Sequence, residues 1–163
     1  MTKIRPAEKE EAEILTKISH RSKGYWNYPQ AYFEIWHDEL TISPEYIERN
    51  AVFVFELDGV VVGYYALVEL PENLEVSGII LRKGFWLEHM FIEPDNIGNG
   101  IGTKLFEHLR ERCRSQGIGE LGILADPNSR GFYEKMGCVY EGDYPSTIED
   151  RTTPYLQYKM MDG

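Results

Sequence analysis

The chain has 163 residues, 42% of them hydrophobic, which is typical of one globular domain over residues 1–163 that buries its own core. A formal net charge of −10 argues against nucleic acid as a partner, because phosphate binding needs a basic surface. The same charge slightly favours a cationic or neutral ligand, and no apolar run is long enough to cross a membrane.

The N-terminal third predicts one short strand followed by helices. Apolar side chains recur at helical spacing after Pro6, and Gly24 ends the first helix. Ser43-Pro44 has the serine cap and first-position proline of a helix start. The predicted elements are a strand at 3–5, helices at 7–22 and 29–40, and a helix start at 43–46.

The rest of the chain predicts a sheet with two further helices. Asp58-Gly59 is a hairpin-turn sequence between two strongly apolar strands. Residues 71–84 are ambiguous, although part of this segment is expected to extend the sheet. The predicted elements are strands at 51–57, 60–69, 85–93 and 121–124, helices at 100–115 and 129–136, and strands from 139 and at 155–161. This order predicts a mixed α/β sheet with helices on both faces.

A glycine-rich turn joins the strand at 85–93 to the helix behind it. Gly98, Gly100 and Gly102 alternate there, and apolar residues follow at spacings of four. Free backbone N–H groups and the positive end of the helix dipole meet at such a turn, which favours a bound phosphate. A dinucleotide fingerprint would need its third glycine at Thr103, and a Walker loop would need lysine directly after Gly102. Neither spacing is present.

The turn resembles the Arg/Gln-x-x-Gly-x-Gly motif of the GNAT acyltransferases. Residues 97–102 read Ile-Gly-Asn-Gly-Ile-Gly and depart from the motif only at Ile97. Residues 125–138, Ala-Asp-Pro-Asn-Ser-Arg-Gly-Phe-Tyr-Glu-Lys-Met-Gly-Cys, are similar to the family's Asn-x-x-Ala-x-x-Phe-Tyr-x-x-x-Gly-Phe stretch, with Gly131 in the place of alanine. The resemblance covers residues 50–161 well and the N-terminal third loosely.

The resemblance implies a GNAT fold: a central mixed, mostly antiparallel sheet of six to seven strands, with a V-shaped cofactor cleft. It also implies transfer of the acetyl group of acetyl-CoA to a primary amine, by direct attack in a ternary complex. We expect a small-molecule or amino-acid-like acceptor. The open alternatives are a protein N-terminus or lysine as acceptor, and a non-catalytic acyl-CoA-binding module.

Two residues are candidates for catalysis. The resemblance implies that Glu88, on a strand expected to be half-buried, deprotonates the amine. His89 is the alternative base, because adjacent strand residues face opposite sides and only one can face the acceptor. Tyr133 matches the tyrosine that in similar enzymes donates to the departing sulfur, although a core position would also explain it.

The resemblance also implies a set of cofactor-binding residues. The backbone groups of Met90 and Ile92 would pair with the pantetheine amides. Asn128 would bond to the pantetheine arm or simply cap its own helix. The N–H groups of the turn would hold the pyrophosphate whether or not residue 97 is Arg or Gln. The set comprises Met90, Ile92, Ile97, Gly98, Asn99, Gly100, Ile101, Gly102, Thr103, Asn128 and Tyr133.

The acceptor side is less defined. Tyr25, Trp26 and Tyr28 are candidate lining residues, although aromatic clusters are more often core. Arg151 would meet an acceptor carboxylate or close its loop on Glu149 or Asp150.

Two cysteines complete the sequence predictions. Cys113 and Cys138 lie in no metal-ligand spacing and are expected to be free thiols in a reducing cytoplasm, without a metal site. The N-terminus, Met-Thr-Lys-Ile-Arg-Pro, does not resemble a secretory leader.

The expected partners are acetyl-CoA and an amine, with neither nucleic acid nor membrane; a homodimer is an open alternative to a monomer.

Overall fold

The computed structural model describes residues 1–76, 79–146, 148 and 150–160. The chain forms two compact units. Unit 1 contains Met1–Leu67 and His89–His108, and unit 2 contains Val68–Glu88 and Leu109–Gly163. Among the described residues, no helix combines the length and the apolar character needed to span a bilayer.

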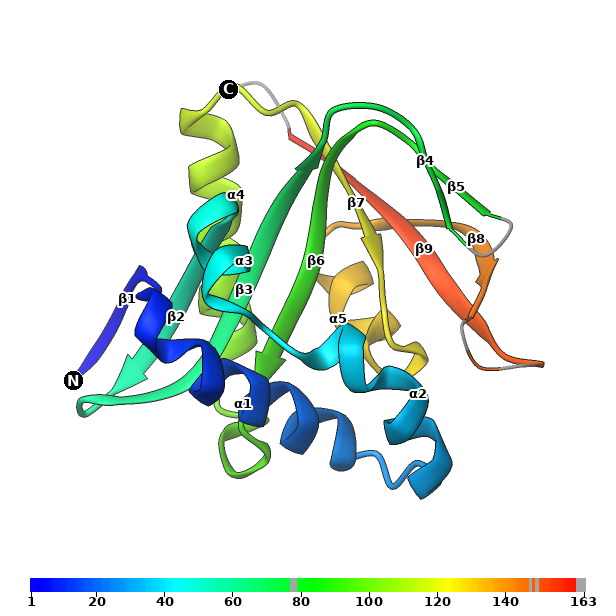
Figure 1. Cartoon of the computed structure of the whole chain (residues 1–163). Helices are drawn as coiled ribbons and strands as arrows, with labels where there is room; N and C mark the ends of the chain where they lie inside the picture. The colour runs from blue at the N-terminus through cyan, green and yellow to red at the C-terminus, as the bar shows by residue number, and fades with distance from the viewer. Residues whose placement is uncertain (77–78, 147, 149, 161–163) are drawn as a thin grey trace. The chain divides into compact units, whose positions relative to one another are not determined.

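The helices and strands follow one another as Figure 1 shows. The α-helices are α1 (Ala12–Gly24), α2 (Gln30–Leu40), α3 (Pro44–Arg49), α4 (Ile101–Ser115) and α5 (Arg130–Lys135), with short 3₁₀ turns η1 (Lys9–Glu11), η2 (Pro94–Asn96) and η3 (Pro127–Ser129). The strands are β1 (Thr2–Pro6), β2 (Ala51–Leu57), β3 (Val60–Leu70), β4 (Leu74–Val76), β5 (Ile79–Leu81), β6 (Gly84–Ile92), β7 (Glu120–Leu124), β8 (Val139–Pro145) and β9 (Thr152–Lys159).

The strands confirm the predicted mixed, mostly antiparallel sheet. Seven strands are ordered β1-β2-β3-β6-β7-β9-β8. β6 and β7 run parallel, whereas the β1–β2, β2–β3, β7–β9 and β8–β9 pairs are antiparallel. Within the ambiguous segment at 71–84, β4 and β5 pair as a separate two-stranded sheet. The strand predicted at 155–161 begins earlier, at Thr152; its expected end at Met161 lies outside the described residues.

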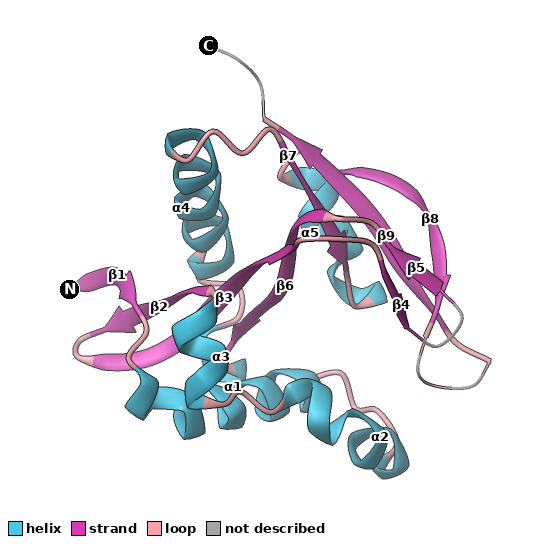
Figure 2. Cartoon of the chain, turned by 45° about the horizontal axis from the view of Figure 1, so that its top comes forward, coloured by secondary structure: helices cyan, strands magenta, loops and turns pink. Residues whose placement is uncertain are grey.

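Unit 1 is built in layers. Figure 2 shows α1 and α3 on one side of β1, β2 and β3, and the start of α4 on the other. Alternate residues of β2 and β3 therefore face different helices. The core on the α1 and α3 side comprises Ala12, Leu15, Ile18, Ile42, Ile47, Val52, Val54, Tyr64 and Ala66.

Unit 2 contains the parallel ladder between β6 and β7, which joins Phe85–Leu87 to Leu121–Ile123. Gly122 is required there by close packing, because an added Cβ would lie 2.8 Å from the Trp86 ring. The indole N–H of Trp86 in turn donates to the Arg82 carbonyl at 2.9 Å.

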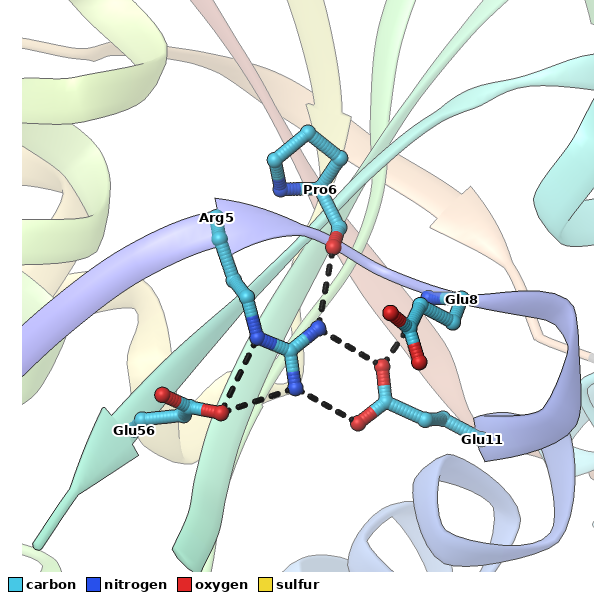
Figure 3. A network of polar contacts seen from close by, with 5 residues as sticks. All are labelled: Arg5, Pro6, Glu8, Glu11 and Glu56. Atoms are coloured by element: carbon cyan, nitrogen blue, oxygen red, sulfur yellow. Dashed lines mark hydrogen bonds and ion pairs between the residues drawn. The ribbon is translucent and has the colours of Figure 1, made fainter. Parts of the chain in front are cut away.

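An ionic cluster joins β1, η1 and β2 in unit 1. Figure 3 shows the Arg5 guanidinium between the carboxylates of Glu11 and Glu56. Two of its nitrogens donate to the two oxygens of Glu11 at 2.9 and 2.8 Å, and Nε donates to Glu56 at 3.0 Å. The Glu11 carboxylate also accepts from the Glu8 N–H at 2.9 Å, which completes a capping box at η1. The cluster stabilises the first strand and the helical segment that follows it.

Candidate active site

The glycine-rich turn of unit 1 has the backbone that the sequence predicts. The chain leaves β6 through η2, and Gly98 and Gly100 then take φ values of 90° and 80°. Side-chain-bearing residues are strained at such angles. An added Cβ at either glycine would meet nothing within 4 Å, so the space beside the turn is open to a ligand.

Helix α4 begins directly after this turn. The Lys104 N–H donates to the Gly100 carbonyl at 3.2 Å. The N–H groups of Ile101, Gly102 and Thr103 belong to the first helical turn, where N–H groups have no acceptor within the helix. The N–H of Ile97 bonds instead to the Pro94 carbonyl at 3.3 Å, so its contribution to a phosphate site is limited.

Gly63 on β3 allows close packing behind the turn. A Cβ there would lie 3.1 Å from the Phe91 carbonyl oxygen, 3.4 Å from Ile92 and 3.5 Å from Leu105 of α4. Gly63 is absent from the sequence predictions. A glycine inside an otherwise apolar strand was the available signal, because it marks close backbone approach.

Strand β6 places Glu88 and His89 in different surroundings. The His89 ring is half-buried, with ring centroids 6.0 Å from Tyr46, 6.3 Å from Tyr64 and 5.7 Å from Phe91. Strand alternation directs Glu88 to the opposite side. Most of β6 is buried or half-buried, as expected for this strand, but Glu88 itself is exposed.

In unit 2, Tyr133 is on the short helix α5 and is 6% exposed. Burial is the main cause that raises the pKa of its phenol, and the nearby Cys138 and Asp126 add to this effect. The hydroxyl therefore remains protonated at neutral pH and can act as a hydrogen-bond donor.

Asn128 does not cap this helix, which corrects one of its two predicted roles. Asp126 is the capping residue of η3, and its carboxylate accepts from the backbone N–H of Asn128 at 2.8 Å. The side-chain amide of Asn128 donates to the same oxygen at 3.0 Å. Asp126 suits this role, because an aspartate carboxylate is as good a cap as an asparagine amide and Pro127 follows it at the first position of the turn.

The two cysteines are buried free thiols in unit 2. Burial raises the pKa of Cys113 to about 11 and that of Cys138 to about 12. The thiolate is the nucleophilic form of cysteine, so neither side chain is prepared for covalent catalysis. Among the described residues, no group of three or more His, Cys, Asp and Glu side chains is arranged to hold a metal ion.

The three candidate acceptor aromatics differ in exposure. Tyr25 and Trp26, on the loop after α1, are 50% and 37% exposed, and their rings meet edge to face. Tyr28 instead packs edge to face on the buried Trp36, with ring centroids 5.2 Å apart. The ammonium of Lys23 lies 4.4 Å from the centre of the Trp36 ring, as in a cation–π contact.

Arg151 lies in the loop before β9. Its backbone closes this loop, because its carbonyl accepts from the Ser146 N–H at 2.9 Å and its N–H donates to the Ile148 carbonyl at 3.2 Å. Glu149, one of its predicted partners, lies outside the described residues.

Comparisons with known proteins agree with the two motifs. A profile described as the acetyltransferase (GNAT) family matches residues 14–138. Over 90 residues the chain is 32% identical to a protein named peptidyl-lysine N-acetyltransferase YjaB from Salmonella typhimurium. That match covers 54% of this chain and 58% of the relative, so the chain spans less than two thirds of the length of that protein.

Solved structures share the fold. A GCN5-related N-acetyltransferase from Rhodopseudomonas palustris superposes with a TM-score of 0.77 at 19% identity, over 98% of this chain and 96% of the other. The PaiA N-acetyltransferase from Thermoplasma acidophilum, solved in complex with coenzyme A, superposes with a TM-score of 0.74 at 19% identity, over 98% and 99% of the two chains. These structures confirm the predicted fold class. Because the matched profile covers most of its length, the chain belongs to the acetyltransferase (GNAT) family.

Proposed function

We propose that this protein is an N-acetyltransferase that transfers the acetyl group of acetyl-CoA to a primary amine. The observation that carries the proposal is the turn before α4, where Gly98 and Gly100 adopt positive φ beside open space. Backbone N–H groups at the start of a helix are a favourable site for a pyrophosphate. Membership of the family supports the assignment of acetyl-CoA as donor.

The residues of the chain fit this donor in separate ways. The N–H groups from Gly98 to Thr103 hold the pyrophosphate. The backbone groups of Met90 and Ile92 pair with the pantetheine amides, as an added strand would. The side-chain amide of Asn128 bonds to the pantetheine arm. Acetyl-CoA itself supplies an acetyl thioester.

Direct attack by the amine requires a base, because an alkylammonium with a pKa of about 10.4 is almost fully charged at neutral pH. Glu88 accepts this proton, directly or through a water molecule, and the amine nitrogen then attacks the thioester carbonyl. The carbon–sulfur bond breaks as the amide forms. The Tyr133 hydroxyl donates a hydrogen bond to the departing sulfur. The ammonium loses two protons in all: Glu88 passes the first to solvent, and the second leaves the nitrogen as the amide forms and balances the proton gained by the thiol.

The different exposure of the two candidate bases supports Glu88. Its exposed carboxylate exchanges protons with solvent after each turnover, as a base in repeated use must. The His89 ring is half-buried among three aromatic rings, which suits packing. His89 remains the alternative base, on the opposite side of β6.

For the acceptor, we propose a small-molecule or amino-acid-like amine. Tyr25 and Trp26 offer exposed rings, which bind alkyl and cationic groups, and Arg151 offers a cation for a carboxylate. The net charge of −10 steers a cation toward the protein. A peptide lysine is the second candidate, because the similar protein from Salmonella typhimurium is named as a peptidyl-lysine N-acetyltransferase.

Calorimetric titration with acetyl-CoA tests the donor site. Gly100→Glu should abolish binding, because it strains the turn and places a like charge beside the pyrophosphate. Gly117→Glu is the matched control: Gly117 also has a positive φ of 72° and open space around its Cα, but it lies after the end of α4. If both variants bind acetyl-CoA like the parent, the turn does not recognise phosphate.

Thiol release from acetyl-CoA tests the acceptor. The panel contains polyamines, free amino acids, and lysine peptides whose N-termini are blocked. Turnover confined to the small amines supports the first candidate, and turnover confined to the peptides supports the second. Tight acetyl-CoA binding without turnover on any amine would contradict the proposed activity and indicate a binding module.

A further inference from the structure

Two adjacent tyrosines in β3 each bond to a different helix of unit 1. Tyr64 and Tyr65 are both 0% exposed and face opposite sides of the sheet. The Tyr64 hydroxyl lies 2.6 Å from Ser19 Oγ on α1. The Tyr65 hydroxyl lies 2.8 Å from Nδ1 of His108 on α4.

The contact between Tyr65 and His108 is closely packed. Phe53 of β2 stacks on Tyr65 with ring centroids 5.5 Å apart and an angle of 19° between the ring planes. The same Phe53 ring lies 4.8 Å from the His108 ring. The Phe53 ring of β2 therefore packs against both partners of the hydrogen bond between β3 and α4.

This hydrogen bond acts on the helix that begins at the glycine-rich turn. Ile101 and Leu105 of α4 are buried, and Gly63 brings the helix close to the sheet. Apolar packing is non-directional and leaves a helix some freedom to rotate or slide, whereas a hydrogen bond is lost within a small change of distance or angle. His108 is two helical turns from Ile101, about 10 Å along the axis. A rotation of α4 about its axis at His108 therefore also moves the N–H groups of the glycine-rich turn.

We propose that Tyr65 is a positioning residue for the acetyl donor: by holding His108 it sets the rotation of α4 and aims the N–H groups of the turn at the pyrophosphate. This inference rests on the proposed function, because it assumes that the turn binds acetyl-CoA. It assigns Tyr65 no contact with the donor. Tyr64 has no such role, because its hydroxyl is bonded to α1.

The neighbouring tyrosine provides a matched control. Tyr65→Phe and Tyr64→Phe each remove one buried hydroxyl from the same strand and keep the ring. We expect Tyr65→Phe to weaken CoA binding about three- to tenfold, which is the usual range for a lost directional hydrogen bond, and Tyr64→Phe to change it less than about twofold. The two variants should lose similar amounts of thermal stability.

A second readout separates positioning from a general loss of stability. Acetyl-pantetheine carries the thioester but no pyrophosphate. With this substrate, Tyr65→Phe and Tyr64→Phe should have the same kcat/KM. With acetyl-CoA, Tyr65→Phe should have the higher KM. His108→Asn retains an acceptor close to the position of Nδ1 and should restore part of the affinity that His108→Leu loses. The double variant Tyr65→Phe/His108→Leu should bind CoA no more weakly than His108→Leu alone.

Equal effects of Tyr64→Phe and Tyr65→Phe on CoA affinity would overturn the inference, and so would an equal loss with acetyl-pantetheine. Failure of the proposed function has a different signature. In that case Gly100→Glu also leaves CoA binding unchanged, whereas failure of the inference alone leaves Gly100→Glu defective and Tyr65→Phe normal.

Discussion

At the scale of single residues, Tyr133 combines a buried ring with a hydroxyl that keeps its proton. Burial raises the pKa of this phenol well above its usual value near 10. A group with a raised pKa stays protonated below that pKa, so the donor is fully present from pH 6 to 9. Tyr133→Phe removes a hydrogen bond to the charged sulfur and should therefore lower kcat about ten- to a hundredfold, by the same factor at every pH from 6 to 9. Acetyl-CoA affinity should not change.

Tyr158→Phe is the control for this prediction, because Tyr158 is also a buried tyrosine of unit 2 but lies on β9. It should keep the parental kcat. If Tyr133→Phe lowers the melting temperature, and the lost activity is explained by the smaller folded fraction with kcat of the folded enzyme unchanged, the core role of this ring is favoured.

Glu88 and His89 are tested as a pair, because they are neighbours on one strand. Glu88→Gln keeps the shape of the side chain and removes its basicity, so we expect the rate at neutral pH to fall by about 10²–10⁴. The loss should shrink as pH rises, because free amine then forms without the enzyme. Rate profiles from pH 6 to 9 measure this effect. If His89→Gln is the defective variant and Glu88→Gln is not, the base is His89.

At the scale of elements, the Arg5 cluster makes the stability of the N-terminal segment depend on pH. Hydrogen bonds from Arg5 lower the pKa of Glu11 below its usual value of 4.5, although burial opposes them. The Glu11 carboxylate therefore binds a proton more readily in the unfolded chain than in the folded chain. The stabilisation from Glu11 is complete above about pH 5 and is lost as pH falls through the folded pKa.

We expect Glu11→Gln to lower the free energy of unfolding at pH 7 by about 2 kcal/mol, because it breaks a mostly buried charged pair. The free energy of unfolding of the variant should also change less between about pH 5 and pH 3 than that of the parent. Urea unfolding across this range measures both effects. Glu10→Gln, an exposed change one residue away, should stay within about 0.5 kcal/mol of the parent at every pH.

At the scale of the whole molecule, the chain offers no reactive thiol for a covalent intermediate among the residues that the structure describes. Both cysteines are buried, with pKa values raised to about 11 and about 12. We expect the initial-rate lines for acetyl-CoA and amine to intersect, as for a ternary complex, and Cys113→Ala and Cys138→Ala to keep their turnover. Parallel lines, or an acetylated cysteine in the mass spectrum without acceptor, would contradict direct attack.

Local patterns in the sequence determined much of the fold. Ile101, Leu105, Leu109 and Cys113 recur every four residues and are all buried on α4, because helical periodicity is a property of neighbouring residues. Asp58 and Gly59 both have positive φ, as a two-residue hairpin turn requires. The conformations of Gly98 and Gly100 in the glycine-rich turn were predictable for the same reason: their backbone angles depend on their own missing side chains.

Only the tertiary structure decided which side chains meet across elements. Neither the closeness of Gly63 to α4 nor the bond between Tyr65 and His108 can be read from spacing, because their partners are distant in the chain. The exposure of Glu88 on a mostly half-buried strand was not predictable either, since strand alternation predicts opposite sides but not what covers each side. The sequence by itself therefore determined the glycine-rich turn and the family, whereas packing between distant segments decided how the helix behind that turn is held in place.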